Sequence, residues 1–267
     1  MRGLLDYYWT QFKLSFVELL QYRVGFLMWA LGMVVEPVIY LVVWRTVALS
    51  SGGAIGGYTA GDFVAYYVVW TLVRQMNIGL TPYVFEGRIQ HGTLSPMLLR
   101  PIHLFHQDLA DFNGLKVVTL LMWLPVGALL AILFRPSLNP ALWQVIAFLA
   151  ALLTGYVMRF TIIWALGMAS FWVTRISAIL QLYGAFELLL SGRLVPLALL
   201  PDWARRLANW LPFQWGFGFP IELLLGKLTP QAVLVGFLAQ GGWFLFGAVA
   251  ASALWRLGVR RYSAVGA

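Results

Sequence analysis

The 267-residue sequence contains no cysteine, only 10% charged residues and only three histidines. Without cysteine, the chain has neither disulfides nor thiolate chemistry, and its redox compartment stays undetermined. Soluble proteins carry about 25% charged residues, whereas this chain is 61% hydrophobic and has a mean hydropathy of +0.81. A soluble globular protein is therefore excluded, and we predict an all-α polytopic membrane protein.

Motifs for common enzymatic chemistry are also missing. The sequence has no Gly-x-x-x-x-Gly-Lys-Ser/Thr phosphate loop, no His-Glu-x-x-His and no Gly-x-Ser-x-Gly. His103 and His106 stand three residues apart beside Asp108, a spacing that a metal site could use, but we interpret the two histidines as facing solvent or lipid headgroups. We therefore predict no catalytic residue, no metal site and no cofactor on this chain. The first 22 residues also lack the pattern of a cleavable signal peptide.

The net charge of +8 does not indicate nucleic-acid binding. Basic residues are scattered at the ends of apolar blocks, where topology signals are found, and form no stripe that would follow a phosphate backbone. With a cytoplasmic N-terminus, twelve of the 18 lysines and arginines fall on or near the inner side. The positive-inside rule thus predicts a multi-pass protein of the plasma (inner) membrane with both termini in the cytoplasm.

Hydropathy predicts one transmembrane domain over residues 1–267 with six spans of about 20 residues. An amphipathic helix over 1–22 is expected to lie in the membrane interface, with its aromatic residues at headgroup depth. Residues 191–229 are punctuated by prolines and tryptophans, which favours a broken, re-entrant external segment. The expected spans are 24–47, 62–80, 115–134, 141–167, 176–190 and 232–254.

Four charged residues of the predicted spans are candidates for pathway or structural groups inside the membrane: Glu36, Arg74, Arg159 and Glu187. Ionisable groups at membrane depth need a partner or water. Glu36, followed by the helix-kinking Pro37, is open to two interpretations, a structural group or a residue of the substrate path. Arg74 lies near the end of its span, so its long stem is expected to snorkel to the surface.

A polar loop over 84–116 interrupts the apolar blocks and contains all three histidines. Gly87 and Gly92 permit sharp turns, and Ser95-Pro96 is a pair typical of a helix start. A second interfacial helix is expected from Ile102, with Asn113-Gly114 marking a break before the third span. The loop also offers four apolar side chains for a rigid contact: Ile89, Leu94, Leu98 and Leu99.

With these elements in this order, the chain resembles the membrane (permease) subunit of type-2 ABC exporters over nearly its whole length. One motif is the loop sequence Glu86-Gly87-Arg88-Ile89, Gly92-x-Leu94 and Leu98-Leu99-Arg100-Pro101. A second is the external sequence Leu190-Ser191-Gly192, Leu200-Pro201-Asp202-Trp203 and Leu211-Pro212. The sequence departs from the pattern that it resembles in its short external segment, and we expect no long C-terminal carbohydrate-binding tail.

The resemblance implies that the loop contains a coupling helix that docks on a separate nucleotide-binding subunit. It also implies a dimer of ABC ATPase subunits that holds ATP and Mg²⁺, a second permease subunit that is the same chain or a paralogue, and contacts with membrane lipids but not nucleic acid. The residues that the resemblance assigns to coupling are Glu86, Arg88, Ile89, Gly92, Leu94, Leu98, Leu99 and Arg100.

The predicted function is therefore half of the substrate path of an ATP-driven exporter, for an amphipathic or lipid-like substrate. Two alternatives remain. An ion-coupled secondary transporter would need carboxylates near the midplane, for which Glu36 and Glu187 are the candidates. An intramembrane lipid-modifying enzyme would need a convergent polar cluster, which the sequence alone does not reveal.

Overall fold

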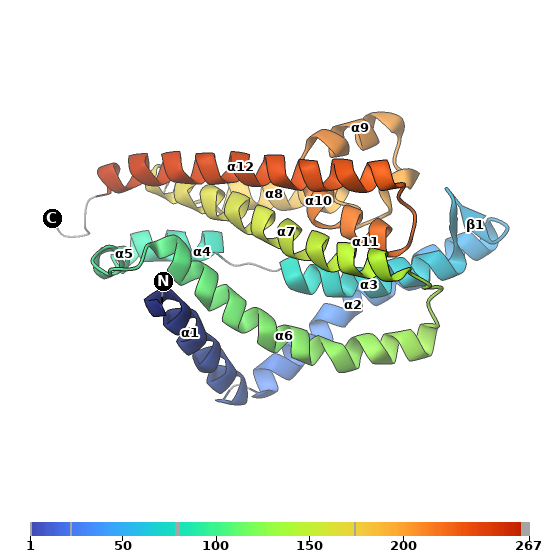
Figure 1. The fold of residues 1–267 in the computed structure, drawn as a ribbon, viewed down its shortest axis with the longest axis horizontal. Helices are drawn as coiled ribbons and strands as arrows, with labels where there is room; N and C mark the ends of the chain where they lie inside the picture. Colours follow the sequence, from blue (N-terminus) through green and yellow to red (C-terminus); the bar gives the residue numbers. More distant parts are fainter. Residues whose placement is uncertain (1, 22, 78–80, 174, 263–267) are drawn as a thin grey trace.

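The structure is a computed structural model that describes residues 2–21, 23–77, 81–173 and 175–262. It is a bundle of helices whose long members run roughly along one axis (Figure 1). Apolar residues recur all round most of these helices, which is typical of segments buried in protein or lipid. The long helices are α1 (Arg2–Gln21), α2 (Arg23–Ser50), α3 (Ala60–Asn77), α6 (Leu104–Phe134), α7 (Leu142–Gly167), α8 (Ser177–Leu190) and α12 (Pro230–Arg261).

Short elements gather at the two ends of the bundle. One end carries α4 (Thr81–Gln90) and α5 (Leu94–Leu98), beside the start of α1 and the end of α12 (Figure 1). The opposite end carries the hairpin of β1 (Ala54–Ile55) and β2 (Tyr58–Thr59). The remaining short elements are the 3₁₀ turns η1 (Met168–Phe171) and η2 (Leu197–Leu199) and the helices α9 (Asp202–Trp210), α10 (Phe213–Gly216) and α11 (Gly218–Leu224).

Three of the described helices are long and apolar enough to cross a membrane: Leu104–Phe134, Leu142–Phe171 and Pro230–Arg261. They coincide with the third, fourth and sixth predicted spans. The other three predicted spans coincide with α2, α3 and α8, of which α8 has only 14 residues, so the count of six stays a prediction. Residues 1, 22 and 78–80, at the ends of the predicted 1–22 helix and 62–80 span, lie outside the described residues.

The predicted break at Asn113-Gly114 is wrong, because α6 continues through it from Leu104 to Phe134. Gly114 serves a close approach instead: a Cβ there would lie 2.4 Å from the Oγ of Ser15 on α1. Asn113 is also used inside the bundle, where its Oδ1 accepts a hydrogen bond from the hydroxyl of Tyr156 at 2.9 Å. The two residues that signal a loop in sequence are thus tertiary contacts of a helix, with α1 lying along α6.

The glycine-rich connection 50–61 contains an ordered hairpin. Ile55 pairs with Tyr58 across a two-residue loop, and both loop residues, Gly56 and Gly57, have positive φ, as a tight hairpin turn requires. The hairpin is held to the helices because the Tyr58 hydroxyl donates to Glu222 Oε1 on α11 at 3.0 Å.

The segment 191–229 is broken into short helices, as its prolines predict. Both α10 and α11 lie against α7 inside the bundle, and most of their residues are buried. Backbone groups of the segment that have no partner within a helix are satisfied inside the bundle. The Tyr66 hydroxyl donates to the carbonyl of Gly192 at 2.7 Å, and the amide of Gly218 donates to the carbonyl of Ser191 at 2.9 Å. Non-helical backbone is therefore covered by protein.

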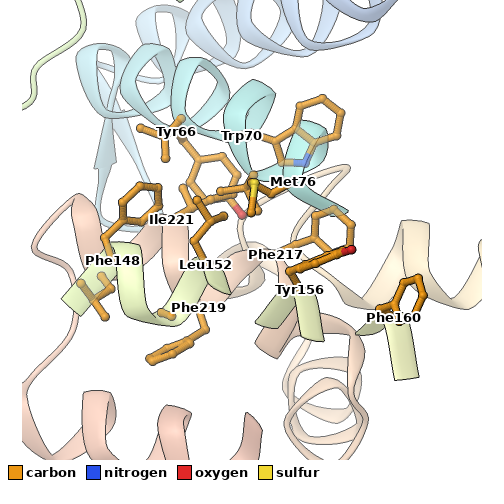
Figure 2. Packing of buried hydrophobic residues seen from close by; sticks show 14 of the residues in the cluster. Tyr66, Trp70, Met76, Phe148, Leu152, Tyr156, Phe160, Phe217, Phe219 and Ile221 are labelled. Atoms are coloured by element: carbon orange, nitrogen blue, oxygen red, sulfur yellow. The ribbon is translucent and has the colours of Figure 1, made fainter. Parts of the chain in front are cut away.

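Large side chains fill the core between α3, α7 and α10–α11 (Figure 2). Tyr66 and Trp70 of α3 are fully buried, and Phe217 and Ile221 reach the same cluster from the broken segment. Aromatic rings in edge-to-face contact stabilise such a cluster beyond the burial of their area. The broken segment is thus part of the core of the bundle.

Small residues let α12 lie close to its neighbours along its length. At Gly247, a Cβ would stand 3.1 Å from Cγ1 of Ile162 and 3.4 Å from that residue's backbone nitrogen. At Gly236, a Cβ would lie 2.1 Å from the ring of Phe219, which is itself buried. Close packing of α12 therefore depends on the absence of a side chain at these positions.

Replacing Gly236 with alanine is expected to lower the free energy of unfolding by about 1–3 kcal/mol, the usual cost of overpacking a core. The matched control is Gly241→Ala on the same helix, where nothing lies within 4 Å of the new Cβ. That control should be neutral or stabilising by up to about 1 kcal/mol, because alanine favours helix more than glycine does. Thermal unfolding in detergent measures both, and equal melting temperatures for the two variants would contradict the packing account.

Candidate functional site

The loop between α3 and α6 folds into two short helices, α4 and α5, joined by a tight turn. Gly92 ends α4 with a φ of 70°, a left-handed conformation that glycine adopts without strain. Its amide donates to the carbonyl of Ile89, and His91 Nδ1 lies 2.8 Å from the carbonyl of Gly87. The predicted turn at Gly92 is therefore present, and it reverses the chain between the two helices.

A buried ion pair fastens this loop to the long helices. The Nη1 of Arg88 on α4 lies 2.6 Å from Oδ1 of Asp108 on α6, without the alignment of a hydrogen bond. The other carboxylate oxygen of Asp108 accepts from Nε1 of Trp164 on α7 at 2.9 Å. Arg88 thus points into the bundle, so it anchors the loop and does not offer its charge to a partner.

Glu86 ties the same helix to the start of α8. Its Oε2 accepts from the backbone amide of Ile176 at 3.2 Å, while Oε1 accepts from Gln90 at 3.1 Å. The amide of Ile176 precedes α8 and has no helical partner there, so the carboxylate satisfies it. The loop is thereby joined to three long helices, α6, α7 and α8.

The four apolar side chains of the predicted contact face do not share one face. Leu94 is fully buried in the core, and Ile89 and Leu98 are half-buried against it. Leu99, in contrast, is 88% exposed just beyond α5. The expectation of a single outward face is wrong in this respect, because three of the four side chains stabilise the loop and one projects from it.

Arg100 and Ser95 complete the attachment of α5. Arg100 Nη1 donates to Oε1 of Gln107 at 3.1 Å, and the Ser95 hydroxyl lies 3.0 Å from that of Tyr262, after the end of α12. Sequence reasoning missed Asp108, Trp164 and Tyr262 as parts of this site. No local pattern reveals their role: Asp108 stands on a predicted interfacial helix beside a second acid, Asp111, and its partner Arg88 lies on another element.

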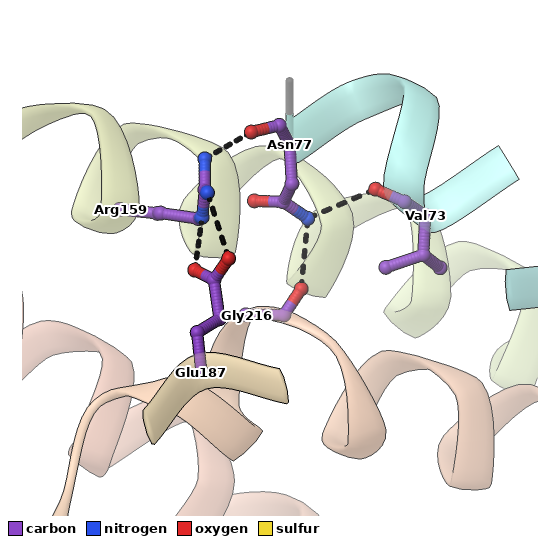
Figure 3. Close-up of polar contacts among 5 residues, drawn as sticks. All are labelled: Val73, Asn77, Arg159, Glu187 and Gly216. Carbon is purple, nitrogen blue, oxygen red and sulfur yellow. Dashed lines mark hydrogen bonds and ion pairs between the residues drawn. The ribbon is translucent and has the colours of Figure 1, made fainter. Parts of the chain in front are cut away.

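The predicted intramembrane charges Arg159 and Glu187 form a buried ion pair (Figure 3). The guanidinium of Arg159 makes two hydrogen bonds to the carboxylate, at 2.7 and 3.0 Å, which is the strongest geometry for this pair. It also donates to the backbone carbonyl of Asn77, whose own side chain donates to the carbonyl of Gly216 at 2.9 Å. The pair therefore links α7, α8 and the ends of α3 and α10.

Glu36 and Arg74 meet as well, so the prediction that Arg74 snorkels to the surface is wrong. Arg74 Nη2 lies 3.1 Å from Glu36 Oε2, and Arg193 Nη2 lies 3.0 Å from the other carboxylate oxygen. Both guanidinium groups also lie over the ring of Trp70. Two arginines on one carboxylate leave a net positive charge that is about one quarter exposed.

The two histidines considered for a metal site have protein partners. Nδ1 of His103 accepts from the amide of Phe105 at the start of α6, and Nδ1 of His106 lies 3.3 Å from the Tyr8 hydroxyl of α1. Within the described ranges, no group of three histidine, cysteine or acidic side chains is placed to hold a metal ion. His103 thus caps the start of α6, and His106 connects α6 with α1.

Comparison with known proteins gives one family. The profile of the ABC-2 family transporter proteins matches residues 34–266, which is most of the chain. No curated protein matches the chain significantly. The family agrees with the apolar helices long enough to span a membrane and confirms the resemblance read from the loop and external motifs. The chain therefore belongs to the ABC-2 transporter family and is a membrane-embedded permease of the type-2 ABC class.

Proposed function

We propose that this permease forms half of the substrate path of an ATP-driven exporter and is moved by a separate ATPase subunit through its α4–α5 loop. The observation that carries the proposal is the contrast within the loop. Leu99 projects from it almost fully exposed, while Arg88, Glu86 and Leu94 fix it to the bundle. A partner that pushes on Leu99 would therefore move α6, α7 and α8 together.

ATP and Mg²⁺ are assigned to that partner, as a dimer of nucleotide-binding subunits, because this chain has no phosphate loop. In this proposal the permease lies in the plasma (inner) membrane. Its α4–α5 end, beside the start of α1 and the end of α12, faces the cytoplasm. The hairpin and the broken 191–229 segment then face outwards. Six spans and an interfacial α1 complete the topology, with Leu5 and Trp9 of α1 exposed to meet lipid.

A second permease subunit, the same chain or a paralogue, is proposed to complete the path. Large aromatic side chains occupy the centre of this bundle (Figure 2), so an amphipathic or lipid-like substrate would pass along its surface and not through its core. Export against a gradient then requires a facing wall, which the second subunit would provide. The net positive group of Glu36, Arg74 and Arg193 is a candidate part of this wall.

The pairing of the intramembrane acids argues against the ion-coupled alternative. Such a transporter needs carboxylates that bind and release a cation, but Glu36 is held by two arginines and Glu187 by one. Transport by the purified permease in liposomes without an ATPase subunit would favour that alternative. The enzymatic alternative has no specific support in the geometry described above.

The direct test is Leu99→Asp. Placing a carboxylate in an apolar contact should weaken docking by at least about 1.4 kcal/mol, roughly tenfold in the affinity of the ATPase subunit. The loss should appear in co-purification and in substrate-stimulated ATPase activity, with membrane insertion unchanged. Leu98→Asp is a less specific test of docking, because Leu98 also packs against the core.

The matched control is Leu142→Asp, the same substitution at a residue that is 76% exposed at the start of α7, a helix end that lies opposite the α4–α5 end of the bundle (Figure 1). Leu142 is the first residue of α7, where an acidic side chain is tolerated by the helix dipole. Normal coupling in Leu99→Asp, or an equal loss in Leu142→Asp, would refute the docking role of the loop.

A further inference from the structure

Two neighbouring cavities lie along α7 and α12 and share Phe244, and the first of them is also lined by residues at the start of α6. The first, of about 420 Å³, lies at the α5 end of the bundle, and the second, of about 320 Å³, continues towards the middle of both helices. Both helices are long and apolar enough to span a membrane. We call the two cavities together the α7–α12 groove; it opens on the surface of the bundle, along two helices long enough to span a membrane.

The inner part of the groove is apolar. Its walls include Leu153, Val157, Phe237 and Phe244. Gln240 also lies there, but its amide is occupied internally: it donates to the carbonyls of Ala151 and Trp215 at 2.9 and 2.8 Å and accepts from Thr154 at 2.6 Å. This part therefore suits a hydrocarbon chain and offers no free polar group that would favour water.

The end of the groove near α5 is positively charged. Arg256 lines it and makes no ion pair or hydrogen bond with any residue that the structure describes. Arg260 and Arg261 follow in the last turn of α12, and no described residue lining either cavity is acidic. An anion would thus find an uncompensated guanidinium there.

His103 adds a neutral donor beside this charge. Burial, together with the nearby His106, lowers the pKa of His103 below its usual value, which favours the neutral imidazole. Because Nδ1 accepts from the amide of Phe105, the proton of the neutral ring is on Nε2. The ring is also packed 4.9 Å from that of Trp255, which fixes its orientation in the wall of the cavity.

The length of the groove matches one leaflet. From Arg256 to Gly241, the helical rise of 1.5 Å per residue gives about 22 Å. Half of a bilayer with its headgroup region is about 20–22 Å thick. A charge at one end and an apolar channel of this length at the other are the two features that a phospholipid molecule presents.

We propose that the α7–α12 groove binds one anionic glycerophospholipid of the leaflet at the α5 end. Its phosphate group lies against Arg256 and the Nε2–H of His103, and one acyl chain runs past Phe244 to Gly241. This lipid is a bound component of the permease and not its transported substrate, so the proposal stands independently of the path assigned above.

The test uses native mass spectrometry of the purified, delipidated permease with phosphatidylglycerol and phosphatidylcholine of identical chains. The intact protein should bind one phosphatidylglycerol with about fivefold preference, the effect of one basic residue at a membrane surface. Arg256→Gln should remove the preference. Arg260→Gln, which deletes the same charge one turn away without lining the groove, should retain it.

A second pair of variants tests the chain-binding part. Nothing lies within 4 Å of a Cβ built at Gly241 or at Gly242, so both positions accept a side chain, but only Gly241 lines the groove. Gly241→Phe should lower the binding of both lipids several-fold, whereas Gly242→Phe should not.

Three results would overturn the proposal: equal binding of the two lipids, equal effects of Arg256→Gln and Arg260→Gln, or equal effects of the two phenylalanine variants. Loss of a permease dimer in Gly241→Phe, with no bound lipid in the intact protein, would assign the groove to a second copy of the chain and overturn it as well. None of these measurements requires the ATPase subunit, so their failure is distinct from failure of the coupling proposal.

Discussion

Glu187→Leu is expected to destabilise the bundle by about 3–5 kcal/mol, the usual cost of removing one partner of a buried ion pair. Glu187 is 4% exposed and accepts two hydrogen bonds from the Arg159 guanidinium. Without the carboxylate, that cation stays buried with the carbonyl of Asn77 and the ring of Phe217 as its partners among the described residues. The measurement is thermal unfolding and the fraction of monodisperse protein in detergent.

The double variant Arg159→Met/Glu187→Leu is the control. Replacing a buried pair with apolar side chains of similar volume is often neutral or stabilising, so the double variant should regain most of the lost stability. A double variant as unstable as Glu187→Leu would show that the loss arises from repacking and not from an unpaired charge. Recovery of stability with loss of transport would assign the pair a role in the movement of α7 against α8.

Asp108→Leu should release the α4–α5 loop from the bundle, with an expected cost of about 3–5 kcal/mol because Arg88 then lies buried without its partner. Asp108 is 1% exposed and holds Arg88 and Trp164 together. Hydrogen exchange should rise in residues 81–98 more than in α7 and α12. Coupling to the ATPase subunit should also fall, because a loop that moves independently of the bundle transmits little force to it.

Two variants make this prediction specific to the ion pair. Arg100→Gln also removes a basic residue of the loop, but its side chain is exposed and the variant loses a hydrogen bond to Gln107 and no buried ion pair, so stability should fall by no more than about 1 kcal/mol. Arg88→Met/Asp108→Leu should restore protection of the loop against exchange. Unchanged exchange in Asp108→Leu would mean that Leu94 and its neighbours alone hold the loop in place.

Hydropathy located the helices well because the bilayer fixes both their length and their composition. The third, fourth and sixth predicted spans agree with long apolar helices to within a few residues, apart from the start of α6 and the end of α12, which runs seven residues beyond the predicted 254. At the start of α6 the predicted break at Asn113-Gly114 was wrong, because asparagine and glycine are common in loops but also occur at close contacts between helices. Gly114 and Asn113 hold α1 and Tyr156 against α6, and no local pattern distinguishes that use from a break.

In the α4–α5 loop, sequence identified the segment but not the direction of its side chains. The turn at Gly92 follows from a local requirement for positive φ. The outward position of Leu99 and the burial of Leu94 depend on where α6 and α7 lie. An apolar residue in a short loop fits either a core or a partner, so its type alone does not decide between them.

The sequence by itself determined the membrane class, the position of the polar loop and the family, because each depends on composition or on residues close together in the chain. Only the tertiary structure decided which charges pair. Glu36 and Arg193 are 157 positions apart, and Arg88 meets Asp108 across a turn of the loop. A charge in an apolar environment must be neutralised. Which opposite charge it meets depends on how the helices pack, and the sequence around either charged residue does not specify that packing.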